Sequence, residues 1–143
     1  METVEVSEIF VSVQGESTYA GLPCFFVRLS GCNLHCRFCD TPQGRTTTRV
    51  ATAAEIRDEF KRSRVALAEI TGGEPLLQAG FPALAEALLA TELGPVLVET
   101  NGSQDIRRIP AAAVAIMDVK CPGSGEEGAM DPANEERLRR HDE

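Results

Sequence analysis

Residues 23–39 read PCFFVRLSGCNLHCRFC, an apolar run followed directly by a loop with three cysteines. The apolar part, residues 23–29, is typical of a strand that is buried on both faces. Cys32, Cys36 and Cys39 follow it with the spacing C-x3-C-x2-C. We therefore expect the thiols to lie on a loop at the carboxyl end of a buried strand.

Composition narrows the class of protein. The chain has 143 residues, which suits one domain, 1–143, with a core of its own. Its 14 Lys and Arg stand against 22 Asp and Glu, a formal net charge of −8, whereas nucleic-acid binding needs clustered basic residues. No apolar stretch approaches the roughly 18 residues that span a bilayer, and the N-terminus lacks the basic start of a signal peptide. We expect a soluble cytoplasmic protein with no nucleic-acid or membrane partner.

Apolar periodicity elsewhere in the chain predicts strands that alternate with helices. A capping box at Thr52 opens one helix, Gly94 is expected to end the next, and Asp131 to begin a third that continues to the chain end. The helices are expected at residues 52–64, 81–93 and from 131 onwards, and the further strands at 5–13, 65–70, 95–98 and 112–117. This order predicts βα units and an α/β fold with a parallel sheet, open or curled into a partial barrel.

Polar motifs follow four successive strands of this series. In sheets built from βα units, ligands bind at the carboxyl ends of the strands, which meet at one rim. One polar strand end would mean little, but four at the same rim predict a binding site. The four motifs are the cysteine triplet, Thr71-Gly72-Gly73-Glu74, Glu99-Thr100-Asn101-Gly102 and Asp118-Val119-Lys120.

The cysteine loop has two interpretations as a metal site. Three thiolates at short spacing suit an iron–sulfur cluster and leave one iron open for chemistry. Structural zinc is the alternative, with His35, Cys24 or Cys121 as the fourth ligand. Zinc ligands usually come as two separated pairs, and the three cysteines form one compact group. Outside a zinc site, Cys24 is expected to be a small buried apolar residue and Cys121 a free thiol near the rim.

A series of motifs in fixed order carries the most specific signal. The cysteine spacing, aromatic Phe38 before the last cysteine, and Gly72-Gly73-Glu74-Pro75 resemble the radical S-adenosylmethionine (SAM) superfamily. Six further matches, from about Glu8 to Gly125, resemble the 7-carboxy-7-deazaguanine synthase family within it. They are Gln14-Gly15-Glu16, Phe26-Val27-Arg28-Leu29, Gly31-Cys32-Asn33-Leu34, Cys39-Asp40-Thr41, Glu99-Thr100-Asn101-Gly102 and Asp118-Val119-Lys120-Cys121-Pro122.

The resemblance implies a 4Fe-4S cluster on Cys32, Cys36 and Cys39, with SAM bound at its open iron. Two glycines in the Gly-Gly-Glu segment would let backbone groups approach the cofactor closely. A tight turn would explain that segment without a ligand, and an ion pair of Lys120 with Asp118 or Glu99 would explain those charges. The SAM contacts that the resemblance implies are Phe38, Thr71, Gly72, Gly73, Glu74, Glu99, Asn101, Asp118 and Lys120.

The resemblance also implies a lyase that converts 6-carboxy-5,6,7,8-tetrahydropterin to 7-carboxy-7-deazaguanine with loss of ammonia, a step towards queuosine, a tRNA modification. Arg28 lies in an apolar strand and needs an anionic partner, either the substrate carboxylate or Glu16. Gln14, Gly15 and Glu16 are expected at the pterin edge, and Thr41, with Asp40, at a Mg²⁺ ion. A homodimer reduced by flavodoxin or ferredoxin is expected.

Two departures from the family pattern bear on this interpretation. Ser17 stands where the family usually has glycine after Gln-Gly-Glu. Family chains also continue beyond residue 143, so we expect the last strands of the barrel to be missing. An activase that makes glycyl radicals on a partner protein is the enzymatic alternative. It would share the cysteine loop but would not need Gln14, Glu16 and Arg28.

Overall fold

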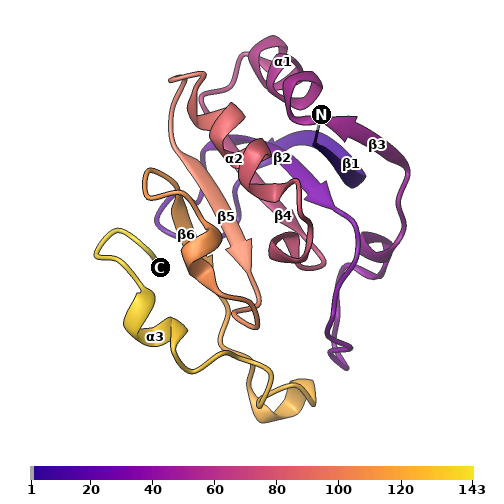
Figure 1. The fold of residues 1–143 in the computed structure, drawn as a ribbon, viewed down its shortest axis with the longest axis vertical. Coiled ribbons are helices and arrows are strands. Elements are labelled where there is room, and N and C mark those ends of the chain that lie inside the picture. The colour runs from indigo at the N-terminus through magenta and orange to yellow at the C-terminus, as the bar shows by residue number, and fades with distance from the viewer. Residues whose placement is uncertain (1) are drawn as a thin grey trace.

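Six strands form one sheet in the computed structural model, which describes residues 2–143 (Figure 1). Met1, the first residue of the expected domain, lies outside the described residues. The strands are β1 (Thr3–Val13), β2 (Pro23–Leu29), β3 (Arg49–Thr52), β4 (Leu67–Gly72), β5 (Val96–Thr100) and β6 (Val114–Met117), and the helices are α1 (Ala53–Ser63), α2 (Phe81–Leu89) and α3 (Asn134–Arg137). The strand order is β3-β1-β2-β4-β5-β6. The sheet is open at both ends, which confirms the expected partial barrel.

The predicted parallel sheet is confirmed for β2, β4, β5 and β6, whose neighbouring pairs all run parallel. β1 instead pairs antiparallel with β2 and with β3. Strand β3 was not predicted, because a strand of four residues has too little alternation to give a periodic signal. The carboxyl ends of the four parallel strands therefore meet at one rim, as expected.

The two faces of the sheet are covered differently. Helices α1 and α2 lie on one face (Figure 1) and bury Ile56, Phe60, Phe81 and Leu84 against the sheet. The other face carries a smaller apolar cluster of Cys24, Phe26, Leu67, Leu97 and Val114. Along β4, Ala68 and Ile70 belong to the helix-covered core, so the side chains between them point to the opposite face. This alternation places polar side chains of the parallel strands on the face that the two helices leave free.

Helix α1 begins as predicted, and α2 ends earlier than predicted. The Thr52 hydroxyl accepts the Glu55 N–H at 3.2 Å, and the Glu55 carboxylate accepts the Thr52 N–H at 2.7 Å, which is the expected capping box. Helix α2 ends at Leu89, and Gly94 does not cap it. A Cβ at Gly94 would lie 2.4 Å from the Ala66 carbonyl oxygen. The glycine is therefore explained by the close passage of two backbone segments before β4 and β5.

The expected C-terminal helix is present only as the single turn α3. Its Asn134 side chain donates to the carbonyls of Gly102 and Gln104, which holds the turn against the loop after β5. The chain then turns back to the edge of β6, where Glu143 N–H donates to Ala115 O at 2.9 Å and accepts from Met117 N at 2.8 Å through its own carbonyl. The prediction of a continuous helix to Glu143 is therefore wrong. These tertiary hydrogen bonds outweigh the local helical signal.

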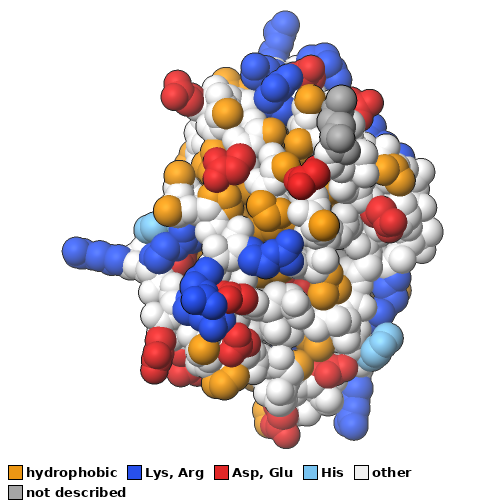
Figure 2. All heavy atoms as spheres, viewed as in Figure 1, with side chains coloured by type: hydrophobic (Ala, Val, Ile, Leu, Met, Phe, Trp, Pro, Cys, Tyr) orange, Lys and Arg blue, Asp and Glu red, His pale blue; other side chains and the backbone are white. Residues whose placement is uncertain are grey.

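The space-filling view of the helix-covered face shows Lys and Arg side chains gathered over α1 (Figure 2). The last turn of α1 contains Lys61 and Arg62, a placement that complements the partial negative charge at a helix C-terminus. No helix among residues 2–143 is both long and apolar enough to cross a membrane.

Replacing Thr52 with Ala should lower the free energy of unfolding by about 1 kcal/mol, because the substitution removes the cap of α1 and leaves an N–H without its partner. Urea unfolding followed by circular dichroism measures the change. Thr46→Ala is the matched control, since Thr46 is exposed and its side chain makes none of the described hydrogen bonds. Equal stability of the two variants would show that the capping box contributes nothing here.

Candidate functional site

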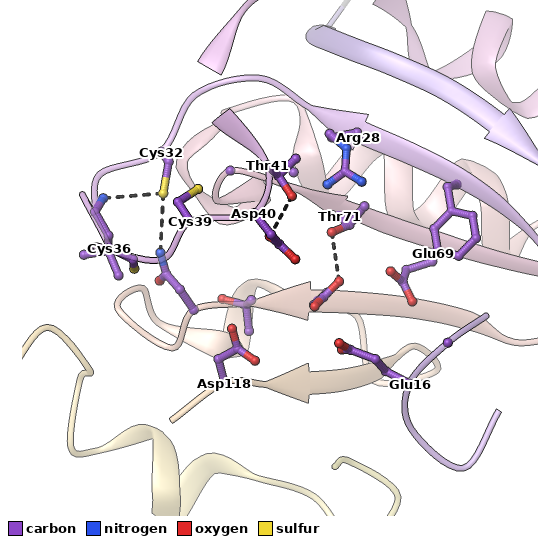
Figure 3. A pocket seen from close by; sticks show the side chains of 18 of the residues that line it. Glu16, Arg28, Cys32, Cys36, Cys39, Asp40, Thr41, Glu69, Thr71 and Asp118 are labelled. Atoms are coloured by element: carbon purple, nitrogen blue, oxygen red, sulfur yellow. Dashed lines mark hydrogen bonds between the residues drawn. The ribbon is translucent and has the colours of Figure 1, made fainter. Parts of the chain in front are cut away.

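A cavity of about 510 Å³ opens on the face of the sheet opposite α1 and α2, at the carboxyl ends of the parallel strands (Figure 3). Its volume lies in the range of small-molecule and cofactor sites. Three parallel strands contribute to the lining, with Arg28 from β2, Thr71 from β4 and Glu99 from β5, and Asp118, directly after β6, joins them. The structure thus brings the four predicted strand ends together around one cavity.

Cys32, Cys36 and Cys39 all line this cavity as free thiols. A Cβ at Gly73 would lie 2.2 Å from the Gly31 carbonyl oxygen and 2.7 Å from Cys32 Cβ. Only glycine therefore allows the end of β4 to pack against the start of the cysteine loop. The Glu74 N–H donates to the same carbonyl oxygen of Gly31 at 2.8 Å, which fixes the loop to the strand end.

The far side of the cysteine loop is held by two further contacts. Arg37 N donates to Ser124 O at 3.0 Å, and the Arg45 guanidinium donates to Leu34 O at 2.5 Å. At its start, Leu34 N donates to Cys32 Sγ at 3.4 Å. A loop supported from both sides can present its thiols in a fixed arrangement to a bound cluster.

The remaining cysteines lie outside the cavity lining. Cys24 is fully buried within β2, and burial together with the charge of Glu69 raises the pKa of its thiol to about 12. The expectation of a small buried apolar residue is confirmed. Cys121 is an exposed free thiol after β6, also as expected. Among residues 2–143, no three His, Cys, Asp or Glu side chains converge as the ligands of one metal ion would.

The Glu74 side chain does not line the cavity, and its contacts are with the protein itself. The carboxyl is fully buried and accepts hydrogen bonds from Leu76 N at 2.9 Å, Asn101 N at 2.7 Å and the Thr100 hydroxyl at 3.0 Å. Burial raises its pKa, and these three donors oppose the shift. These contacts tie the loop after β4 to the loop after β5, as the turn interpretation of the Gly-Gly-Glu segment expects. The SAM contact at Glu74 stays a prediction.

Asn101 and Lys120 line the cavity, and both have internal partners. The Asn101 amide donates to Asn33 Oδ1 at 3.3 Å and faces Cys32 Sγ at 3.9 Å. Lys120 Nζ pairs with Asp118 Oδ2 at 2.7 Å, the ion pair that the sequence left open. Burial lowers the Lys120 pKa, but the hydrogen bond and charge of Asp118 and the nearby thiols of Cys36 and Cys32 raise it overall. The side chain therefore carries its positive charge close to the thiols.

Of the other predicted contacts, Thr71 Oγ1 donates to Glu99 Oε2 at 2.9 Å, and Thr41 Oγ1 donates to Asp40 Oδ1 at 2.9 Å (Figure 3). Phe38 is 62% exposed at the cavity edge. The backbones of Gly72, Gly73 and Gly15 and the side chains of Gln14 and Glu16 complete the predicted lining.

Arg28 has an internal partner, but it is Glu8 and not Glu16. Arg28 Nε donates to Glu8 Oε1 at 2.7 Å, and the guanidinium stands 5.9 Å from the centre of the Phe10 ring. Glu8 faces Arg28 in the antiparallel register of β1 and β2. Sequence alone could not find this pair, because the register of the two strands was unknown. Arg28 still lines the cavity, and Nε makes its one described hydrogen bond.

Glu69 is the main residue that sequence reasoning missed. It lies in the middle of β4, is 3% exposed and lines the cavity. The alternation in Leu67-Ala-Glu-Ile-Thr71 was the available signal, because Glu69 shares a face with Thr71 at the strand end.

Comparison with known protein families agrees with the cluster site that this geometry suggests. The model of the radical SAM superfamily matches residues 26–119, and the chain belongs to this superfamily. Membership implies a 4Fe-4S cluster and SAM as cofactors. The three cavity-facing thiols and the glycine contact that fixes their loop fit the cluster. The zinc interpretation is therefore set aside.

More specific similarity is to proteins named 7-carboxy-7-deazaguanine synthase. The protein of that name from Koribacter versatilis (strain Ellin345) is 43% identical over 142 residues, which cover 98% of this chain and 62% of the relative. The one from Chlorobaculum tepidum is 43% identical over 122 residues, 85% of this chain and 55% of the relative. The chain thus spans about six tenths of their length. The crystal structure of QueE from Escherichia coli matches with a TM-score of 0.75 at 23% identity, over 93% of this chain and 67% of that one, and so shows the same fold.

Replacing Glu74 with Ala should lower the free energy of unfolding by about 3 kcal/mol, because two backbone N–H groups and a hydroxyl lose their buried acceptor. Glu74→Gln keeps one acceptor oxygen and should cost less. Chemical denaturation measures both, with Glu86→Ala on the exposed side of α2 as the control. Normal stability together with lost SAM binding in Glu74→Ala would instead make Glu74 a cofactor ligand.

Proposed function

We propose that the chain carries the cluster, SAM and substrate contacts of a 7-carboxy-7-deazaguanine synthase. The reaction would convert 6-carboxy-5,6,7,8-tetrahydropterin to 7-carboxy-7-deazaguanine with loss of ammonia, within queuosine and 7-deazapurine biosynthesis. The observation that carries the proposal is the meeting of the cysteine triplet with the Arg28, Thr71, Glu99 and Lys120 side chains around one cavity. The names of the similar proteins favour this reaction over a glycyl-radical activase.

Cys32, Cys36 and Cys39 are proposed as the three ligands of the cluster. When bound, the cluster and SAM supply hydrogen-atom abstraction by a carbon radical. The backbone of Gly73 lies against the start of the cysteine loop, and that of Gly72 against Leu29 at the end of β2. Both glycines can approach the methionine end of SAM without side chains in the way. The remaining proposed SAM contacts are Phe38, Thr71, Glu99, Asn101, Asp118 and Lys120, all on the cavity wall.

Arg28 is proposed to bind the carboxylate of the substrate. Its described hydrogen bond uses Nε and Glu8, so the two Nη groups can form a charge-assisted pair with a second carboxylate. Thr41 and Asp40 present oxygen atoms on the cavity wall, and we assign Mg²⁺ to Thr41. We further propose one domain that acts as a cytoplasmic homodimer and receives electrons from flavodoxin or ferredoxin.

Anaerobic reconstitution with iron and sulfide should give a brown protein, and replacement of Cys36 with Ala should abolish the bound iron and sulfide, because a cluster on three thiolates loses a ligand that nothing nearby replaces. Chemical iron and sulfide analysis and the absorbance spectrum are the measurements. Cys121→Ala is the control, since this exposed thiol does not line the cavity. If Cys36→Ala still binds iron and sulfide, the assignment of Cys36 as a cluster ligand is wrong.

Replacing Arg28 with Met should weaken binding of the pterin at least tenfold and leave SAM binding unchanged, because the charge-assisted pair with the substrate carboxylate is lost. Anaerobic titrations of each ligand measure the two affinities. The matched control is Glu8→Gln, which removes the negative charge of the internal partner of Arg28 and keeps the guanidinium. A parallel loss of SAM affinity in Arg28→Met would show that Arg28 has a structural role only.

A further inference from the structure

Glu69 is a buried acid on the cavity floor that the proposed chemistry has not used. Its strand neighbours are Phe26 on β2 and Leu97 on β5, both in the smaller apolar cluster. Among residues 2–143, no Lys, Arg or His forms an ion pair with it. A carboxylate buried without a cation is costly, so the charge of Glu69 must be removed or compensated by hydrogen bonds.

Two polar groups act on Glu69. The Gln14 amide donates from Nε2 to Glu69 Oε2. The other is Glu99, whose charge raises the pKa of Glu69 and whose carboxylate accepts from the Thr71 hydroxyl at 2.9 Å. A hydrogen bond between the two carboxyl groups also raises the pKa of Glu69, and such a bond requires a proton on one of them.

The proton belongs on Glu69, which is the more buried of the two. Burial and the charge of Glu99 raise the pKa of Glu69 to about 8, and the Gln14 amide opposes the shift. The other groups that face it are Glu16 from the β1–β2 loop, which raises the pKa further, and the Cys24 thiol of β2, which stays protonated. Arg28 of β2 is paired with Glu8.

We propose that Glu69 is a positioning residue that acts in its protonated form. Its carbonyl oxygen accepts from Gln14, and its hydroxyl donates to Glu99. Because Gln14 Nε2 is held in this way, Gln14 Oε1 is turned away from Glu69. Gln14 Oε1 accepts from Glu16 N at 3.3 Å. The cavity floor then presents two acceptors, the amide oxygen of Gln14 and the carboxylate of Glu99.

A floor made of acceptors selects a ligand edge made of donors. The amino group and ring N–H of an aminopyrimidinone form such an edge, which names the part of the substrate that this floor would recognise. This inference rests on the proposed function. Above the pKa of Glu69, a second negative charge beside Glu99 breaks the network, so substrate binding should weaken as the pH rises.

The test compares Glu69→Gln with Glu69→Leu in the reconstituted full chain. Glutamine imitates the protonated acid, since its oxygen can accept from Gln14 and its amide can donate to Glu99. Leucine removes both hydrogen bonds. The measurement is the dissociation constant of 6-carboxy-5,6,7,8-tetrahydropterin in the presence of SAM, at pH values from about 6.5 to about 9.5.

For the unsubstituted chain, the dissociation constant should rise up to tenfold per pH unit above about pH 8, as release of one proton requires. Glu69→Gln should bind as tightly at neutral pH and lose this dependence, whereas Glu69→Leu should bind at least tenfold more weakly at every pH. An unchanged pH dependence in Glu69→Gln, or equal binding by Glu69→Leu, would overturn the proposal.

Infrared difference spectroscopy of the ligand-free protein separates this proposal from the proposed function. A protonated carboxyl band at pH 7 should disappear in Glu69→Gln and on raising the pH in the unsubstituted chain. Because the pKa of Glu69 is raised in the folded state, the free energy of unfolding of the unsubstituted chain should also fall as the pH rises from about 5 to about 8. Glu69→Gln should remove that fall. If the band is present but the pterin does not bind, the proposed function fails and the protonated network stands. If the band is absent, the network fails whatever the substrate.

Discussion

The arrangement of the site depends on the contact between Gly73 and the start of the cysteine loop, where no side chain fits. The Gly31 carbonyl oxygen lies 2.2 Å from where a Cβ of Gly73 would be, and it accepts the next N–H, that of Glu74, at 2.8 Å. Glu74 in turn accepts the Asn101 N–H at 2.7 Å. The loops after β2 and β4 are thereby joined through the backbone, and those after β4 and β5 through the Glu74 carboxylate. A larger residue at Gly73 would separate them and move the three thiols away from the strand ends.

Charge is distributed unequally in the cavity, and this limits what it can bind. Carboxyl groups of Glu16, Glu69, Glu99 and Asp118 face it, and the pKa of Glu16 is raised by Glu99, by burial, and by Asp118 and Asp40. The cations on the wall are fewer, and Lys120 is already paired with Asp118. An acidic cavity attracts a cationic ligand, and SAM is a sulfonium cation with a further ammonium group. The acidic wall thus suits the cofactor that superfamily membership implies.

The sequence predicted the parallel strands and the rim where they meet, because apolar runs and polar strand ends are local signals. It could not predict features that depend on which residues face each other. The Arg28–Glu8 pair follows from the register of β1 and β2, and the buried Glu74 carboxylate is held by Thr100 and Asn101, which the sequence does not place next to it. The role of Gly94 and the short α3 also depended on tertiary contacts. Glu69 was within reach, since its alternation with Ala68 and Ile70 was visible.

That alternation also explains how one sheet serves stability and chemistry at once. Ala68 and Ile70 of β4 lie in the helix-covered core, while Glu69 and Thr71 line the cavity on the opposite face. The helix-covered face has the larger apolar core, and it can therefore offset the cost of burying the Glu69 carboxyl without a cation. Because side chains alternate with a period of two, a slip of β4 by one residue would exchange the two sets, exposing Ile70 to the cavity and driving Glu69 into the core. The register that builds the core is therefore the same one that builds the site, and neither can change alone.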